Sequence, residues 1–278
     1  MPTSTYSDLE SVLKFFNHAK PRSLLDIGVG FGKIGFLARE FLDVMMNESY
    51  RPADWKVRID GIEAFSDYIQ DHHKALYDSI HIGDAFEVID GLGKYDAIVL
   101  GDSLEHFEKE RAWQMLDKCA EHCTGYLMIF IPLGERWEQE AIYGNEYERH
   151  LSFWTREEFE PIATACKFSR FEGIGDYGRF LIHVGHYRHH RLRMHADDLF
   201  RNGEKDKAIA VLTSGMEGLP VNVESEYQLV DFLLEMDRLR QAVHRLKSIQ
   251  IKFPNEAPVV GAYIERVEAF LARQAKAS

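Results

Sequence analysis

The chain has few cysteines and no long apolar run. Three of its 278 residues are cysteine. Cys119 and Cys123 lie one turn apart on an expected helix and Cys166 lies well away from them. We interpret all three as reduced thiols, because a structural zinc site usually has four ligands. No segment approaches the roughly 20 apolar residues that cross a bilayer, so no membrane span is expected.

Positive charge is also scarce. The chain has 33 lysine and arginine residues against 45 aspartate and glutamate residues, a net charge of −12. Nucleic-acid binding usually needs a basic surface, so no RNA or DNA partner is expected. The one basic segment, residues 188–195, could bind an anionic ligand, but a solvated helix start or a domain hinge is the favoured interpretation.

The length predicts about two domains, and a hydrophobic content of 45% provides ample core. The first residues, Met1 to Ser4, do not begin like a signal peptide. We therefore expect a cytoplasmic protein.

A glycine-rich turn is the most informative feature. Residues 24–35 read LLDIGVGFGKIG, an apolar strand that enters a turn and then a helix. Glycines in such a turn allow it to bend tightly and let a ligand approach the backbone. The turn alone also suits NAD or FAD. Asp26 at the strand end would repel a pyrophosphate but can receive a cationic amino group, which favours S-adenosylmethionine.

Polar side chains also follow the next three expected strands, at residues 57–63, 79–82 and 95–100. Glu63 can accept hydrogen bonds from both hydroxyls of a ribose. Asp84 can accept a hydrogen bond from the exocyclic amine of adenine, and Phe86 can cover the adenine ring. Asp102 follows the fourth strand.

The segments LLDIGVGFGKIG, IDGIEAF, IGDAF, YDAIVLGDSLEHF and GYLMIFIPLG occur in this order. Over residues 8–187 the chain resembles the class I S-adenosylmethionine-dependent methyltransferases. It departs from them at Val29, where Cys or Ser is common. The resemblance implies an α/β fold with a doubly wound, seven-stranded, mostly parallel sheet. It assigns cofactor binding to Asp26, Gly28, Gly30, Gly32, Glu63, Asp84, Ala85, Phe86 and Asp102.

Element order predicts where the catalytic domain ends. A helix is expected over residues 7–19, followed by alternating strands and helices, which is typical of a parallel sheet with helices on both faces. Residues 168–171 and 180–186 flank three glycines and predict a hairpin. By the resemblance this hairpin is the antiparallel edge of the sheet. We expect a methyltransferase domain at 1–187 and a helical domain at 188–278.

The helical segment carries an internal repeat. Leu199, Ala208, Leu212 and Pro220 recur 34 residues later as Leu233, Ala242, Leu246 and Pro254, and a last helix is expected at 259–272. This is the tetratricopeptide period. Two repeats are fewer than the three or so that are stable alone, so they should pack on the first domain or on a second copy. A lid support, a homodimer element and a docking surface for a protein partner all remain open.

Two histidines are candidate bases, because methylation of a hydroxyl requires removal of its proton. His106 lies just past the fourth strand, and His150 lies in the long segment after the fifth. An imidazole titrates near neutral pH, which suits this role. The alternative for each is a structural histidine.

The segment around residues 143–154 is rich in aromatic and charged residues and looks like a wall for the acceptor. Its aromatic rings can stack on sugar or aromatic rings, and its polar groups can bind hydroxyls. The segment loosely resembles methyltransferases of bacterial polysaccharide modification. The candidate substrate residues are Tyr143, Asn145, Tyr147, Glu148 and Trp154.

A divalent metal at Asp102, Glu105 and His106 is possible but not favoured, because the sequence does not show these groups converging. The prediction is an O-methyltransferase that acts on a glycan, a sugar or a small polar metabolite. Two alternatives are a non-catalytic cofactor-binding partner acting through the helical repeats, and an NAD-linked oxidoreductase.

Overall fold

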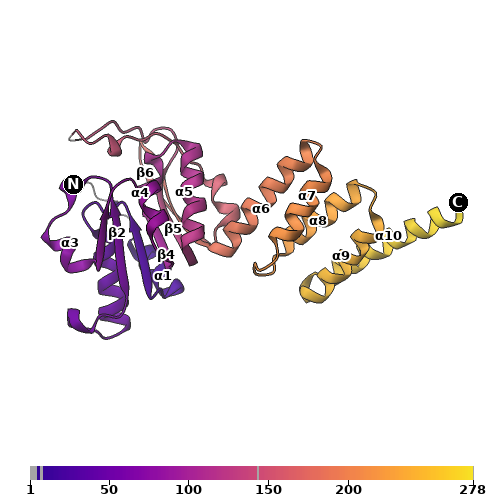
Figure 1. Cartoon of the computed structure of the whole chain (residues 1–278), viewed down its shortest axis with the longest axis horizontal. Helices are drawn as coiled ribbons and strands as arrows, with labels where there is room; N and C mark the ends of the chain where they lie inside the picture. The colour runs from indigo at the N-terminus through magenta and orange to yellow at the C-terminus, as the bar shows by residue number, and fades with distance from the viewer. Residues whose placement is uncertain (1–4, 7–8, 143, 278) are drawn as a thin grey trace. The chain divides into compact units, whose positions relative to one another are not determined.

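The computed structural model describes residues 5–6, 9–142 and 144–277. The chain divides into two units, Met1–Val184 and Gly185–Ser278. Figure 1 draws the first from indigo to magenta and the second from orange to yellow. In the described part of the chain, no helix is long and apolar enough to span a membrane.

The first unit is built on a seven-stranded sheet with the order β3-β2-β1-β4-β5-β7-β6. Strands β1 to β5 are parallel, whereas β7 runs antiparallel to both β5 and β6. This confirms the predicted mostly parallel sheet with an antiparallel hairpin at one edge. The strands are β1 (Ser23–Ile27), β2 (Arg58–Glu63), β3 (Ser79–Ile82), β4 (Tyr95–Gly101), β5 (Cys123–Leu133), β6 (Ala165–Phe171) and β7 (Gly175–His183).

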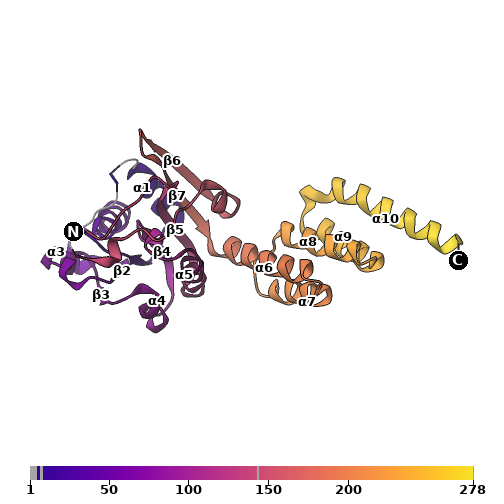
Figure 2. The same cartoon turned by 90° about the horizontal axis from the view of Figure 1, so that it is seen from above.

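Helices cover both faces of this sheet, and Figure 2 shows α1 on one side with α4 and α5 on the other. The longer helices are α1 (Leu9–Ala19), α2 (Lys33–Ala38), the π-helical η1 (Arg39–Met46), α3 (Asp71–Leu76), α4 (Ala85–Val88) and α5 (Lys109–His122). Single turns are η2 (Pro52–Asp54), η3 (Ser66–Tyr68), η4 (Ile89–Gly91), η5 (Leu104–His106), η6 (Glu146–Glu148), η7 (Arg156–Glu158) and η8 (Glu160–Ile162).

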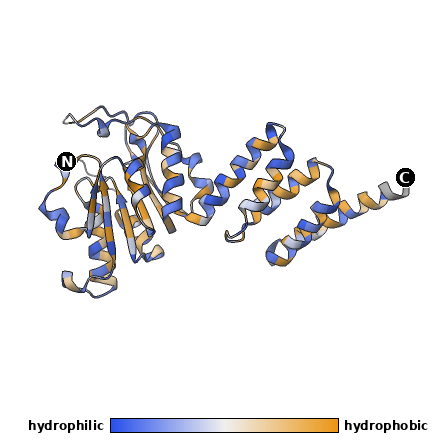
Figure 3. Ribbon diagram, viewed as in Figure 1, coloured by the Kyte–Doolittle hydropathy of each residue, from blue (hydrophilic) through white to orange (hydrophobic). Residues whose placement is uncertain are grey.

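The central strands β1, β4 and β5 are mostly apolar because helices cover both faces of the sheet. Leu24, Leu25, Ile98 and Leu100 are fully buried. Figure 3 shows this concentration of hydrophobic residues in the sheet. The predicted first helix is observed as α1; its expected first residues, 7 and 8, lie outside the described residues.

The last strand differs from its prediction. A strand was predicted at residues 180–186, whereas β7 starts at Gly175 and ends at His183. Residues from Val184 onward already belong to helix α6. Val184 and Tyr187 are both buried and lie three positions apart, a spacing that is typical of a helix.

The second unit contains only helices in its described residues. They are α6 (Val184–Arg201), α7 (Lys205–Gly215), α8 (Val223–Glu235), α9 (Leu239–Lys252), η9 (Pro254–Glu256) and α10 (Ala257–Ala277). Helices α7 and α9 begin 34 residues apart. The repeated pairs Ala208/Ala242 and Leu212/Leu246 are all buried in one hydrophobic core. The tetratricopeptide-like assignment stays a prediction.

A buried ion pair connects η1 to its neighbours. Arg39 Nη1 donates to Asp43 Oδ2 and to the Val57 carbonyl, both at 2.7 Å, and Arg39 Nε donates to the Leu76 carbonyl at 3.1 Å. The Arg39 and Asp43 side chains are 4% and 0% exposed. This one guanidinium therefore links η1 to the segment before β2 and to the last residue of α3.

We predict that Arg39→Met destabilises the fold by about 3–5 kcal/mol, because it leaves a buried carboxylate without its charge partner. Urea unfolding of the full chain measures the change. The control is Arg51→Met, since Arg51 pairs with Asp54 at the exposed surface and should matter little. Equal unfolding midpoints for Arg39→Met and the wild type would contradict the prediction.

Candidate functional site

The turn between β1 and α2 has the backbone that its glycines predict. The φ angles of Gly28, Gly30 and Gly32 are +82°, +51° and +83°. These values lie in the left-handed region that favours glycine. A Cβ on Gly28 would also lie 2.5 Å from Ser103 Oγ. Both the conformation and the space at Gly28 therefore require glycine.

Side chains from three other segments hold this turn. Glu63, at the end of β2, accepts a hydrogen bond from Gly30 N–H at 2.9 Å, and His73 Nε2 lies 3.0 Å from the Gly30 carbonyl oxygen. Ser103, after β4, donates to the Ile27 carbonyl at 2.6 Å. The turn is thus fixed by contacts within the protein.

Asp26 lies behind the turn and is fully buried. Tyr77 donates its phenolic hydrogen to Asp26 Oδ2 at 2.6 Å and accepts from Gly35 N–H at 3.1 Å. The second oxygen, Oδ1, has no hydrogen-bond partner among the described residues. Burial raises the pKa of Asp26 to about 8, against the opposing effect of the Tyr77 hydrogen bond. Asp26 is therefore largely protonated at neutral pH.

A cavity of about 790 Å³ opens at the carboxyl ends of the parallel strands. This volume is within the range of about 300–1,000 Å³ that is usual for small-molecule sites. The predicted site residues that line it are Gly28, Gly30, Glu63, Asp84, Ala85, Asp102, His106, Asn145, Tyr147, Glu148 and His150.

Other predicted residues stand elsewhere. Asp26 is fully buried, and neither Asp26 nor Gly32 is among the residues that line the cavity. Tyr143 lies outside the described residues.

Phe86 and Trp154, predicted to contact the cofactor and the acceptor, are not among the residues that line the cavity. The cationic groups of Arg111 and Lys118 lie 4.3 and 4.2 Å from the Phe86 ring centre, so the protein itself covers this ring. Trp154 is fully buried and stacks on Phe159. Both aromatic rings serve packing, which the sequence does not distinguish from ligand stacking.

Asp84 is already engaged in two contacts. Its Oδ1 accepts from Phe86 N–H at 2.9 Å and so caps α4, and its Oδ2 pairs with Arg111 at 3.0 Å. Any contact of Asp84 with a ligand therefore uses the remaining lone pairs of these oxygens.

The segment after β5 that lines the cavity contains both buried and exposed side chains. Asn145 is buried; its Oδ1 accepts from Tyr147 N–H at 3.0 Å, and its Nδ2 donates to Tyr68 Oη at 3.2 Å. Glu148 is buried beside it, and burial raises the pKa of this carboxyl. Tyr147 is exposed and lines the cavity. Among these residues, Tyr147 is the best placed to contact a ligand.

The two predicted histidines are neighbours in space, with ring centres 5.0 Å apart. His106 Nδ1 lies 3.1 Å from the Arg149 carbonyl oxygen, and His150 Nδ1 contacts the Trp137 carbonyl oxygen. A carbonyl only accepts, so each Nδ1 carries the hydrogen and each Nε2 keeps its lone pair. Burial lowers the pKa of both imidazoles, which favours their neutral form.

The cavity wall is strongly acidic. Two cationic side chains, Lys33 and Arg111, stand among its lining residues. The carboxyl side chains are seven: Glu63, Asp84, Asp102, Glu105, Glu108, Glu146 and Glu148. Such a wall attracts cationic ligands and repels anionic ones.

No protein-family model matches the chain, and no curated protein matches it. Among solved structures, it is similar to a candidate O-methyltransferase of Nostoc punctiforme (18% identity, TM-score 0.42, 63% of this chain and 55% of that chain). The chain thus spans about half the length of that protein.

Two further structures are similar over 63% of this chain, each with a TM-score of 0.42. One is the magnesium protoporphyrin IX methyltransferase of Synechocystis with bound S-adenosylmethionine, at 12% identity and 77% of that chain. The other is an S-adenosylmethionine-dependent methyltransferase of Archaeoglobus fulgidus, at 16% identity and 93% of that chain.

Sequence reasoning missed the groups that hold the turn. Ser103 lies in the segment YDAIVLGDSLEHF, but no sequence pattern indicated that its hydroxyl donates a hydrogen bond to the backbone of β1. His73 and Tyr77 lie in and just after α3 and have no motif of their own. Their role depends on contacts between residues more than 40 positions apart.

We predict that Asp26→Asn gains stability relative to the wild type as the pH rises. A carboxyl whose pKa is raised from 3.8 to about 8 binds its proton more tightly in the folded chain. Its ionisation therefore lowers the stability of the wild type progressively between about pH 4 and pH 8. Thermal unfolding of both proteins at about pH 5 and pH 8 measures the difference.

The control is Asp67→Asn, which alters an exposed carboxyl on η3. Its difference from the wild type should be the same at both pH values. A pH-independent difference for Asp26→Asn would show that the Asp26 carboxyl is ionised at ordinary pH.

Proposed function

We propose that the chain is an S-adenosylmethionine-dependent methyltransferase that methylates an oxygen of a glycan, a sugar or a small polar metabolite. The acidic wall of the cavity carries this proposal, because a glycine turn and carboxyl groups at successive strand ends line the same cavity. S-Adenosylmethionine is cationic at its sulfonium and ammonium groups, which suits such a wall.

The donor side would use the turn and the strand ends. Glu63 already accepts from Gly30 N–H and Phe65 N–H, each at 2.9 Å, and its remaining lone pairs can accept ribose hydroxyls. The unpartnered Oδ1 of Asp26 can receive the ammonium group through a hydrogen-bonded chain. Asp84 and Ala85 stand where the adenine would lie.

The same contacts argue against NAD. A pyrophosphate needs free backbone amides at the glycine turn and the helix start. Here the Gly30 amide donates to a carboxylate, Glu63, which would lie against the phosphate oxygens. An NAD-linked oxidoreductase is therefore disfavoured on both hydrogen bonding and charge.

The acceptor side supports transfer to oxygen. In this reaction the hydroxyl oxygen forms a bond to the methyl carbon, and the carbon–sulfur electron pair stays on sulfur. The enzyme must align the two groups and remove the hydroxyl proton. His106 and His150 line the cavity with neutral rings, each with an Nε2 lone pair for a proton or a cation.

We predict that S-adenosylhomocysteine binds with one-to-one stoichiometry and affinity on the order of micromolar, whereas NADH does not bind. Calorimetric titration of the full chain measures both. At pH 7, binding should also release a proton, because the ammonium group favours ionisation of Asp26, whose pKa is about 8. Titration in two buffers of different ionisation enthalpy detects this proton.

Asp26→Ala should abolish this binding, whereas His150→Ala should preserve it and reduce methyl transfer from labelled donor to an accepted substrate. Binding of NADH, or normal binding of S-adenosylhomocysteine by Asp26→Ala, would contradict the proposed function.

A further inference from the structure

Glu105 is a buried carboxyl that the fold leaves without hydrogen bonds. Its side chain is 1% exposed, and neither carboxylate oxygen has a hydrogen-bond partner among the described residues. Burying a carboxyl in this way is costly, and buried carboxyl groups are normally paired, hydrogen-bonded or bound to a metal. Packing alone does not require an acidic side chain at this position, so the carboxyl is a candidate ligand group.

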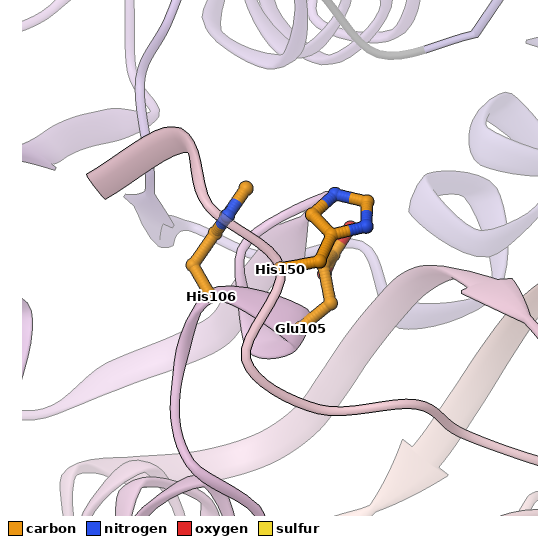
Figure 4. A group of neighbouring side chains, drawn as sticks. All are labelled: Glu105, His106 and His150. Carbon is orange, nitrogen blue, oxygen red and sulfur yellow. The ribbon is translucent and has the colours of Figure 1, made fainter. Parts of the chain in front are cut away.

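Two imidazoles stand beside this carboxyl. One possible ligand atom each from Glu105, His106 and His150 lies within 4.8 Å of the others. Figure 4 shows Glu105 and His106 at consecutive positions of η5, with His150 on the neighbouring loop. Groups at this spacing can bind one ion after small side-chain movements.

The histidines are oriented as metal ligands usually are. Each gives its Nδ1 hydrogen to a backbone carbonyl, that of Arg149 for His106 and that of Trp137 for His150. In metal sites such a bond fixes the ring and directs the other nitrogen at the ion. The Nε2 atoms of both rings are thereby left as ligand atoms.

Backbone contacts fix the two segments against each other. Leu151 N–H and Ser152 N–H donate to the Glu105 carbonyl at 2.8 and 3.1 Å. His150 is the residue just before these donors, and Glu105, His106 and His150 all line the cavity. The cluster is therefore held in place by the fold and open to a ligand.

We infer that Glu105, His106 and His150 form a three-ligand site for a divalent transition-metal ion, with its remaining coordination positions open to the acceptor hydroxyl. Two imidazoles and one carboxylate suit ions such as Zn²⁺, Co²⁺ or Fe²⁺. The proposed metal site is inferred from the geometry of the three side chains alone, whereas a role of the metal ion in methyl transfer rests on the proposed function.

In that role the ion lowers the pKa of the bound hydroxyl, which loses its proton to solvent water. The resulting oxygen anion forms the new bond to the methyl carbon, and the carbon–sulfur electron pair remains on sulfur. His106 and His150 then serve as ligands, and neither has to act as a free base.

Titration of the full chain with Co²⁺ tests the site. We expect one equivalent to bind, with a visible absorption spectrum that reports nitrogen and oxygen ligands, and Zn²⁺ to displace it. Glu105→Gln should abolish the spectrum. Without metal, Glu105→Gln should unfold no earlier than the wild type, because the carboxylate makes no hydrogen bond that the change would remove.

The control variant is His122→Ala. His122 ends α5 and is not among the cavity-lining residues, so this variant should keep the Co²⁺ spectrum. Absence of stoichiometric Co²⁺ binding by the wild type, or an unchanged spectrum in Glu105→Gln, would overturn the inference.

The binding of S-adenosylhomocysteine, measured on the same samples, separates this inference from the proposed function. Binding of that ligand without Co²⁺ would leave the methyltransferase proposal standing and remove the metal site. Binding of Co²⁺ without that ligand would keep the metal site and remove its role in methyl transfer.

Discussion

The left-handed backbone of the glycine turn is the constraint around which the first unit is arranged. Such a turn is stable only where its polar groups have partners, because unpaired buried amides and carbonyls are costly. Here Glu63, His73 and Ser103 supply those partners from β2, α3 and the segment after β4. The parallel order of β1, β2 and β4 brings these segments to one edge, so the sheet topology and the turn stabilise each other.

The carboxyl groups buried at this edge of the sheet are costly for the stability of the fold. Burial raises the pKa of Asp26 to about 8 and also raises the pKa of Glu63 and Glu105. Glu105 in particular has no hydrogen-bond partner among the described residues, so an amide or apolar side chain at this position would be better for the fold. Acids retained at such a cost are typical of sites whose stabilising partner is a ligand.

The fold and half of the site follow from local patterns, whereas the rest depends on distant contacts. The glycine turn and the acids at strand ends were predictable because each lies directly after a strand, and parallel strands end at one edge. Trp154 and Phe86 are not among the residues that line the cavity, and the sequence alone does not distinguish an aromatic residue that packs from one that binds a ligand. His150 and Glu105 are 45 positions apart, so only the contact between their loops brings them together.

The carboxyl groups of the cavity wall would have opposite effects on binding of the donor and on reaction of the acceptor. Under the proposed function, the acids at the donor end would stabilise the cationic donor, and the thioether product would be held less strongly because it has lost the sulfonium charge. At the acceptor end, Glu105 and Glu148 would oppose the loss of a proton from a hydroxyl, since negative charge develops there. The divalent ion that we propose at Glu105, His106 and His150 would reverse the sign of this effect. The Glu105 carboxyl, which would hinder the reaction without the ion, would then hold the positive charge that promotes it.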